Sequence, residues 1–233
     1  MRILALDTTE MRGSVALLAG GQVRAARRHD TNVDYSEWLL PAVGEVMGQD
    51  GGEVRSVELV AVATGPGSFT GLRVGLTTAK AWAEVYGMPI VGVSRLEAMA
   101  QSVQPEGGGV AAFYDAQRGQ VFGGLYTAPR GGMAASGEEV VLSPEEFLGT
   151  VAKAAGRETV RWVSLDPELV ADLAVWKARQ ECGDTMESCD PQVAVAIGRL
   201  AERRARAGLF SDPLELDANY VRRSDAEIFW KGR

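Results

Sequence analysis

Residues 65–75 read Gly-Pro-Gly-Ser-Phe-Thr-Gly-Leu-Arg-Val-Gly, and this stretch decides the fold. The apolar run at residues 58–64 predicts a buried strand before it, and a helix is expected from about residue 71 to 86 after it. Backbone N–H groups at a strand-to-helix junction are able to hold an anion. The stretch fits neither standard nucleotide motif, because Thr70 stands where a dinucleotide fingerprint has glycine and no Gly-Lys-Ser/Thr is present. A tight turn with close helix packing is therefore favoured over direct phosphate contact.

The elements around this stretch alternate strands and helices, which is typical of an α/β protein. Short apolar runs predict strands at residues 2–7, 13–19, 22–29 and 90–93. Asp34 followed by Glu37 resembles a capping box and predicts a helix there. Ser94 and Glu97 open a third helix in the same way.

The same order of elements occurs a second time after a joint at residues 104–109, which contains one proline and three glycines. Strands are expected at residues 110–115, 120–127, 138–142 and 160–164, and helices are expected after Ser143-Pro144 and after Asp166-Pro167. No residue-level repeat accompanies this order. We therefore expect two similar lobes, at residues 1–103 and 104–190. Residues 191–233 then form a last helix, opened by Asp190-Pro191 and ended by Gly208, and an extended tail, whose return to the first lobe stays open.

Composition narrows the class of protein. With 46% hydrophobic and 24% charged residues the chain is expected to be globular. A formal net charge of −7 argues against stand-alone binding of nucleic acid. No apolar run matches a signal peptide or a membrane span, and two cysteines form no disulfide framework, so we expect a cytoplasmic protein. The one histidine, His29, is expected on a solvated edge. A single histidine argues against a histidine-ligated metal site.

Acidic residues end two of the expected strands. Asp7, followed by Thr8 and Thr9, ends the first strand, and Asp115 ends the first strand of the second lobe. A carboxylate followed by hydroxyls is able to organise a magnesium–phosphate site, but a simple turn closing a hairpin explains the same residues and is favoured at each position taken alone. Two acidic strand ends in equivalent places would face one cleft, and this keeps a nucleotide hypothesis open.

The helix expected at residues 71–86 is apolar on more than one side. A surface helix needs an apolar stripe only about 100° wide. Two explanations stay open, because the helix is either enclosed in the core or also faces a partner subunit.

The chain resembles the TsaB family, the dimerisation subunit of the bacterial tRNA threonylcarbamoyladenosine transferase. The segments that carry this resemblance are residues 1–9 (MRILALDTT), 35–41 (YSEWLLP), 65–75, 92–94 (GVS), 115–121 (DAQRGQV) and 219–222 (NYVR). They occur in family order from residue 1 to about residue 223, and residues 65–75 are the most specific of them.

The resemblance implies an actin/Hsp70-like ATPase (ribonuclease H-like) fold with two similar lobes. It implies a non-catalytic assembly and activating subunit that binds the catalytic subunit TsaD, with TsaE as a further partner, tRNA contacted indirectly through the complex, and a homodimer when TsaD is absent. It places the contact with TsaD on the helices after Asp34 and after Gly71. The residues expected there are Leu39, Val43, Leu72, Gly75, Leu76, Ala79 and Trp82.

Departures from the pattern of TsaD support a non-catalytic chain. Arg95 and Met99 stand where TsaD carries its metal-binding histidines, and Asp115-Ala116-Gln117 stands where TsaD has a Gly-Gly-His loop. We therefore expect no catalytic residue and no metal site. Asp7 and Thr8 are expected to line a vestigial cleft that binds ATP or ADP weakly or not at all. Tyr35 replaces a histidine that is common in the family, so a role for that histidine does not carry over.

Two other classes of function stay open. The fold family contains sugar and acetate kinases, so a stand-alone phosphotransferase is conceivable, although no convincing second phosphate loop is visible. A glycoprotease-like peptidase would need a metal or a nucleophile–base pair, and the sequence offers neither.

Overall fold

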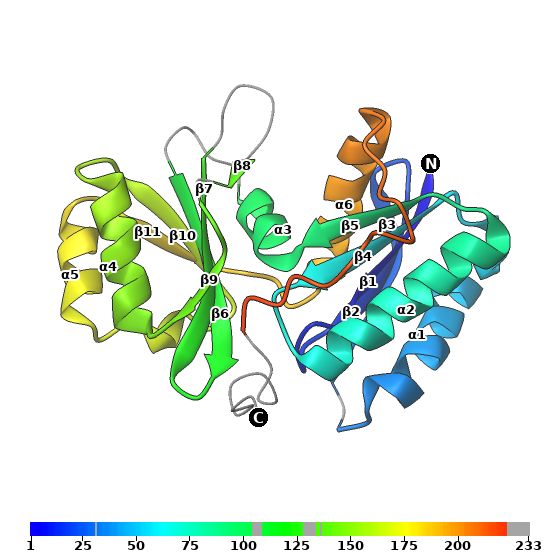
Figure 1. Ribbon diagram of the computed structural model, residues 1–233, viewed down its shortest axis with the longest axis horizontal. Helices are drawn as coiled ribbons and strands as arrows, with labels where there is room; N and C mark the ends of the chain where they lie inside the picture. The colour runs from blue at the N-terminus through cyan, green and yellow to red at the C-terminus, as the bar shows by residue number, and fades with distance from the viewer. Residues whose placement is uncertain (31, 104–108, 128–133, 136, 223–233) are drawn as a thin grey trace, which may run out of the picture.

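The computed structural model describes residues 1–30, 32–103, 109–127, 134–135 and 137–222. These residues form two mixed β-sheets that lie side by side, with the helix α3 (Arg95–Ser102) between them (Figure 1). The helix begins where β5 (Ile90–Ser94) of the first sheet ends, and it packs against β6 (Gly109–Gln117) and β7 (Gln120–Thr127) of the second sheet. One short helix therefore packs between the two sheets.

The first sheet has the strand order β3-β2-β1-β4-β5. Its strands are β1 (Arg2–Asp7), β2 (Ser14–Ala19), β3 (Gln22–Arg28), β4 (Leu59–Gly65) and β5 (Ile90–Ser94). The first three form an antiparallel meander, and β4 and β5 run parallel to β1. Parallel strands are covered on both faces, which is why β4 is a nearly continuous apolar run with little alternation.

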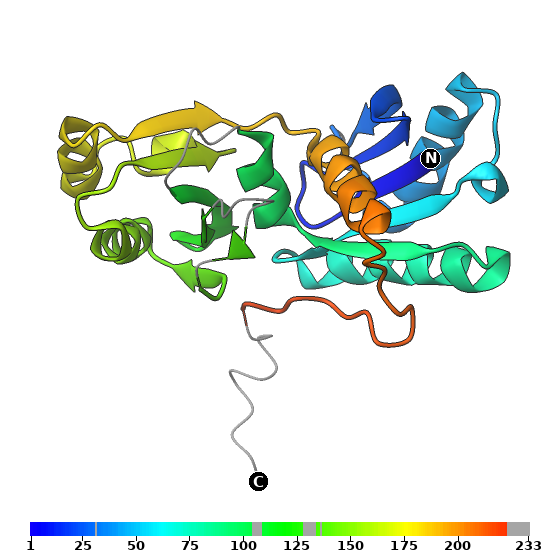
Figure 2. The same cartoon turned by 90° about the horizontal axis from the view of Figure 1, so that it is seen from above.

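Helices cover both faces of this sheet. On one face α1 (Tyr35–Gln49) and α2 (Phe69–Tyr86) pack against the side chains of Leu4 and Leu6. On the other face α6 (Val193–Arg206) packs against Ile3 and Ala5, and Figure 2 shows it crossing the sheet from above. The alternation along β1 therefore supplies two separate apolar cores.

The second sheet has the order β11-β10-β6-β7-β8, and β9 also pairs with β7. Its strands are β6 (Gly109–Gln117), β7 (Gln120–Thr127), β8 (Ala134–Ala135), β9 (Val140–Leu142), β10 (Val160–Ser164) and β11 (Thr185–Ser188). The helices α4 (Pro144–Ala155) and α5 (Ala174–Glu181) pack on one face over an aromatic core of Phe113, Phe147, Trp162 and Trp176. Two short 3-10 turns, Val54–Ser56 and Pro167–Leu169, complete the elements of the described residues.

The two sheets repeat one order of elements, as the sequence predicts. Three strands, a helix, a strand, a helix, a strand and a helix run from β1 to α3 and again from β6 to α6, if the two-residue β8 is set aside. The helix after Ser94 and the helix after Ser143 are capped as expected, since each serine hydroxyl accepts a backbone N–H three residues later. The expected joint at residues 104–109 lies, apart from Gly109, outside the described residues.

Several local predictions need correction. Asp34 is the N-cap of α1, but its side chain makes no capping hydrogen bond, so the capping box is absent. Asp166-Pro167 opens only a 3-10 turn, and α5 starts later, at Ala174. The last helix has Gln192, not Asp190, as its N-cap. The strands β8 and β11 were not expected, and α2 begins at Phe69, within the glycine-rich stretch.

Across the part of the chain that the structure describes, none of the helices combines the length and the apolar character that a membrane span requires.

Candidate functional site

The gap between the two sheets contains a cavity of about 620 Å³. Its walls come from the loop after β1, the glycine turn before α2, the β6–β7 hairpin and the segment after α6. Asp115 lines the cavity as the sequence predicts, and so does Asp166, which follows β10 and was not singled out. Asp7 and Thr8 do not line it, whereas their neighbours Thr9 and Glu10 do. Asp7 and Thr8 therefore lie behind the wall of the cleft, and the expectation that they line it is not met.

The polar atoms of Asp7 and Thr8 are bound within the chain. Asp7 is fully buried, and its Oδ1 accepts hydrogen bonds from the backbone N–H and the hydroxyl of Thr9, at 3.1 and 2.7 Å. The hydroxyl of Thr8 donates to the carbonyl oxygen of Gly71 at 2.7 Å, which ties the end of β1 to the first turn of α2. Gly71 is required there, because a Cβ at this position would overlap the carbonyl oxygen of Thr8.

Arg95, the first residue of α3, supplies the positive charge beneath the cavity. Its side chain is 0% exposed, and its Nε and Nη2 donate to Asp7 Oδ2 at 2.9 Å and to Glu10 Oε1 at 2.7 Å. The guanidinium also lies 4.5 Å from the ring centre of Tyr114 on β6. Burial alone would lower the pKa of Arg95, but the two carboxylates raise it well above its usual value, so the side chain stays charged.

A second arginine joins the two sheets. Arg12, in the loop between β1 and β2, donates to both oxygens of Asp166 at 2.7 and 2.9 Å and also pairs with Glu10. Asp166 accepts the backbone N–H of Asp115 as well, at 2.8 Å. Burial raises the pKa of Asp166, but the hydrogen bonds from Arg12 and Asp115 outweigh it, and the net shift is downward. We call Asp7, Glu10, Arg12, Arg95 and Asp166 the ion cluster.

The ion cluster does not fit a divalent cation with a bound phosphate. Such a site needs carboxylate oxygens that are free to bind the metal. Here the carboxylates of Asp7, Glu10 and Asp166 each accept from an arginine. Within the described ranges, no group of three His, Cys, Asp or Glu side chains is arranged to hold a metal ion. Met99, which stands where TsaD carries its second metal-binding histidine, is fully buried in the apolar core.

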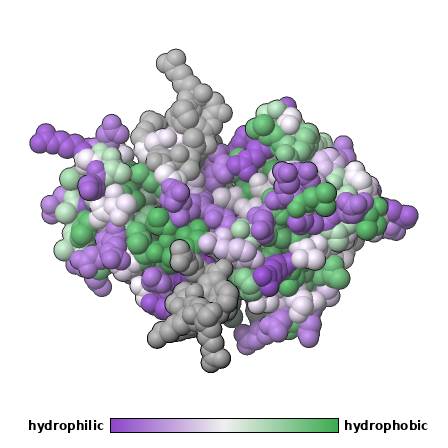
Figure 3. Space-filling model, viewed as in Figure 1, coloured by the Kyte–Doolittle hydropathy of each residue, from purple (hydrophilic) through white to green (hydrophobic). Residues whose placement is uncertain are grey.

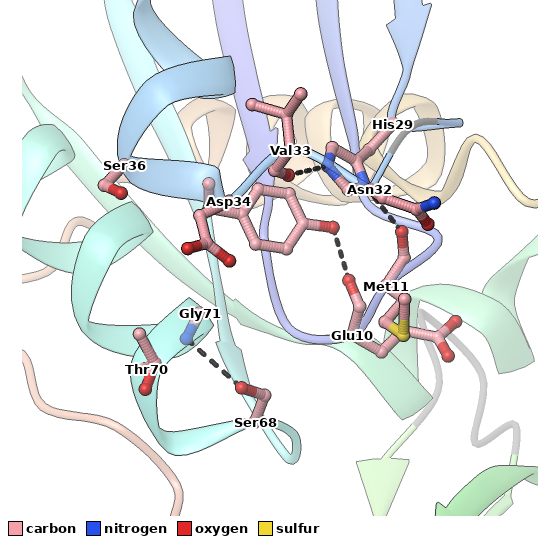
Figure 4. A pocket seen from close by; sticks show the side chains of 11 residues that line it. Glu10, Met11, His29, Asn32, Val33, Asp34, Ser36, Ser68, Thr70 and Gly71 are labelled. Carbon is pink, nitrogen blue, oxygen red and sulfur yellow. Dashed lines mark hydrogen bonds between the residues drawn. The ribbon is translucent and has the colours of Figure 1, made fainter.

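A second cavity, of about 470 Å³, opens between the N-terminal ends of α1 and α2 (Figure 4). His29 lines it and is only 6% exposed, so its placement on a solvated edge is wrong. Its ring nitrogens lie 2.7 Å from the carbonyl oxygens of Met11 and Val33, and its ring stacks against Tyr35 at 4.5 Å. His29 is buried because its ring packs against other aromatic rings and both of its nitrogens lie at hydrogen-bond distance from backbone carbonyl oxygens.

Tyr35 has a structural role in the same place. Its hydroxyl accepts the backbone N–H of Gly13 at 2.8 Å and donates to the carbonyl oxygen of Glu10. Burial raises the pKa of this hydroxyl, so it stays protonated. Tyr35 thereby fixes the loop that carries two members of the ion cluster.

The residues expected to contact a partner lie mostly inside the first lobe. Leu39, Val43, Leu72, Gly75, Leu76 and Ala79 are buried, and Trp82 is half-buried. Side chains with almost no exposed area have nothing left to bury against another protein. The large apolar side chains that α1 and α2 expose are Leu40, Phe69, Val85 and Tyr86. Figure 3 shows hydrophobic residues interspersed with hydrophilic ones over this lobe.

Comparisons with known proteins agree with this architecture. A hexokinase of the ROK group from Thermus thermophilus shares the fold alone, with a TM-score of 0.51 at 13% identity, covering 87% of this chain and 98% of that one. The crystal structure titled YeaZ from Pseudomonas aeruginosa is much more similar, with a TM-score of 0.71 at 26% identity, covering 94% of this chain and 99% of that one. The chain is thus an α/β protein of the actin-like ATPase fold, with two similar lobes.

Sequence comparisons define the family. Residues 25–166 match the family model described as TsaD, tRNA N6-adenosine threonylcarbamoyltransferase. A relative from Bacillus subtilis named tRNA threonylcarbamoyladenosine biosynthesis protein TsaB is 36% identical over 131 residues, which is 56% of this chain. The chain therefore belongs to the TsaD family and, within it, to the TsaB group after which its relatives from Bacillus subtilis, Escherichia coli and Haemophilus influenzae are named. The match spans little more than half, 57%, of the length of the Bacillus relative.

Proposed function

We propose that this chain is a non-catalytic subunit of the machinery that forms threonylcarbamoyladenosine in tRNA, and that it activates a TsaD-type catalytic subunit by binding it. The names of its relatives support the pathway. The ion cluster is the observation that supports a non-catalytic role. Each of its three carboxylates is paired with an arginine of the same chain, so they are poorly suited to act as a base or to hold a metal.

The outer surface of α1 and α2 is our candidate for the partner contact. The two helices lie next to each other on one face of the first sheet (Figure 1). Leu40 of α1 is 58% exposed and Val85 of α2 is 73% exposed. In the absence of TsaD the same surface would pair with a second copy, because a two-fold contact needs only self-complementarity. TsaE and tRNA would join through the complex, in the cytoplasm.

Co-purification with TsaD of the same organism tests the contact. Leu40→Glu and Val85→Glu place a charge on the surface without entering the core, unlike changes at Leu76 or Ala79. Burying a large apolar side chain contributes about 1.5–3 kcal/mol, so each variant should weaken binding about 10- to 100-fold. Leu209→Glu, a matched change at an exposed leucine after α6, should bind TsaD normally. Unchanged affinity of both helix variants would reject the surface.

A modification assay tests the role itself. TsaD and its other partners should form threonylcarbamoyladenosine in tRNA only when this chain is added, and the chain alone should hydrolyse neither nucleotide nor casein. Turnover of ATP or a protein substrate by the purified chain would instead favour a phosphotransferase or a peptidase. Analytical ultracentrifugation of the chain alone tests the homodimer separately.

A further inference from the structure

The segment that follows α6 runs along the first lobe before it reaches the second. Its orange-to-red trace leaves α6, passes along the first lobe and ends over the middle of the molecule in Figure 1, on one side of the two sheets in Figure 2. The carbonyl oxygen of Leu216 accepts from Lys80 Nζ of α2 at 2.9 Å. The backbone N–H of Asn219 donates to the carbonyl oxygen of Thr64, at the end of β4, at 2.7 Å. These contacts hold the segment to the first sheet and to α2.

The far end of the segment is bound to the second sheet. Arg222 donates to the carbonyl oxygen of Ala116 and to Oε1 of Gln120, both at 2.7 Å, and these residues flank the tip of the β6–β7 hairpin. The Nδ2 of Asn219 donates to Oε2 of Glu139 at 2.6 Å. Seven residues, 216–222, thus span from one sheet to the other.

Glu139 joins the segment to both lobes. Besides Asn219, its carboxylate accepts from the hydroxyl of Tyr126 on β7 at 2.6 Å and from the hydroxyl of Ser94. Ser94 is the N-cap of α3, the helix between the two sheets. One half-buried carboxylate is therefore the meeting point of α3, β7 and the C-terminal segment.

The segment also forms part of the wall of the cleft. Tyr220 and Arg222 both line the 620 Å³ cavity. The ring of Tyr220 lies 5.3 Å from that of Phe69, and its hydroxyl accepts from Arg73 of α2 at 3.3 Å. If the segment left its position, the cavity would lose this wall and the sheets would lose these links.

We propose that residues 212–222 form a releasable strap that holds the two lobes in one orientation and narrows the cleft, with Glu139 as its latch. The strap is suited to release because side-chain hydrogen bonds make most of its attachments, and its Leu214 is 84% exposed. The strap is bonded to α2 by Lys80 and Arg73 and to the second sheet by Arg222, so its release would break its bonds to both lobes. This inference does not depend on the proposed partner.

Hydrogen exchange of the purified chain tests the strap. Asn219→Ala combined with Arg222→Ala removes its bonds to Glu139 and to the β6–β7 hairpin. Amide exchange across residues 214–222 should rise at least tenfold, and exchange in β1 and β4 should not change. Glu139→Ala, which changes no strap residue and, of the strap's bonds, removes only that of Asn219, should also raise exchange there, by a smaller factor. Leu214→Ala is the matched control and should leave exchange at its parental level.

Truncation tests whether the strap holds the lobes. A chain that ends at Arg222 keeps the strap and is the reference for small-angle scattering. A chain that ends at Ser211 should show a larger radius of gyration and faster exchange at residues 116–121. The proposal is overturned if residues 214–222 of the full chain exchange as fast as an unfolded peptide. It is overturned equally if the point variants leave strap exchange unchanged, or if truncation at Ser211 leaves both lobes as they were.

Discussion

Replacing Arg95 with methionine should destabilise the folded chain more than any other single loss of charge in the cleft. Methionine retains much of the apolar volume, but it leaves Asp7 buried with no cation and Glu10 with Arg12 alone. Breaking a buried ion pair by removing one partner costs about 3–5 kcal/mol. In a chain of this size 1 kcal/mol shifts the melting temperature by about 2–4 °C, so Arg95→Met should lower it by about 6–20 °C.

Urea unfolding followed by tryptophan fluorescence measures this loss. The double variant Arg95→Met with Asp7→Asn removes the stranded charge together with its partner, so it should recover part of the stability that Arg95→Met loses. Arg199→Met, at an exposed arginine of α6, serves as the control and should change the free energy of unfolding by less than about 0.5 kcal/mol. A loss below 1 kcal/mol for Arg95→Met would refute the view that this guanidinium stabilises the base of the cleft.

Three further changes test other parts of the structure by the same urea assay. Gly71→Ala should cost about 1–3 kcal/mol, because the new methyl group overlaps the carbonyl oxygen of Thr8 and the backbone has to move; a neutral result would contradict this tight approach. Asp184→Asn should cost about 3–5 kcal/mol, because it strips the charge partner from buried Arg179 in the second lobe; a cost near zero would mean that Arg179 finds another partner. Burial raises the pKa of Glu139 above its unfolded value, although its three hydrogen bonds oppose the shift. Its contribution to stability should therefore be complete below about pH 4.5 and decline as the pH rises through the folded-state pKa, and Glu139→Gln should remove this dependence; identical pH profiles for parent and variant would disprove the assignment.

The order of elements was predictable because local signals mark it. Ser94 and the Ser143-Pro144 pair begin helices through contacts within one turn, and such contacts depend little on the rest of the fold. The strand β11 escaped prediction because Thr185–Ser188 is a short, mostly polar and exposed edge strand, which has no apolar alternation to detect. The capping box at Asp34 was a false signal, because the residue spacing is necessary for that motif but does not fix the side chain in place.

The ion cluster was out of reach for a different reason. Arg95 and Asp7 are 88 positions apart in the sequence, and nothing in either local pattern indicates that they meet. The repeated order of elements predicted that acidic strand ends would face one cleft, and Asp115 does line it. It could not predict that two arginines of the same chain would pair with Asp7, Glu10 and Asp166. That outcome depends on where α3 lies between the sheets, which is a property of the whole fold.

The position of α2 shows how far helix composition can be interpreted. Its apolar residues beyond one stripe left two explanations open, enclosure in the core or contact with a partner. Leu76 and Ala79 pack into the core of the first sheet, and α1 lies against the same helix. The segment after α6 covers a further side, since its Leu216 and Ala218 pack against the same apolar cluster and the ring of Tyr220 lies 5.3 Å from that of Phe69. Three neighbours from distant parts of the chain thus account for most of this apolar character, which favours enclosure over a partner contact for most of the helix. The apolar faces of a helix indicate how many of its sides are covered, but they do not indicate whether the same chain or a partner covers them. A partner contact has to be tested on the apolar residues that stay exposed, above all on Val85.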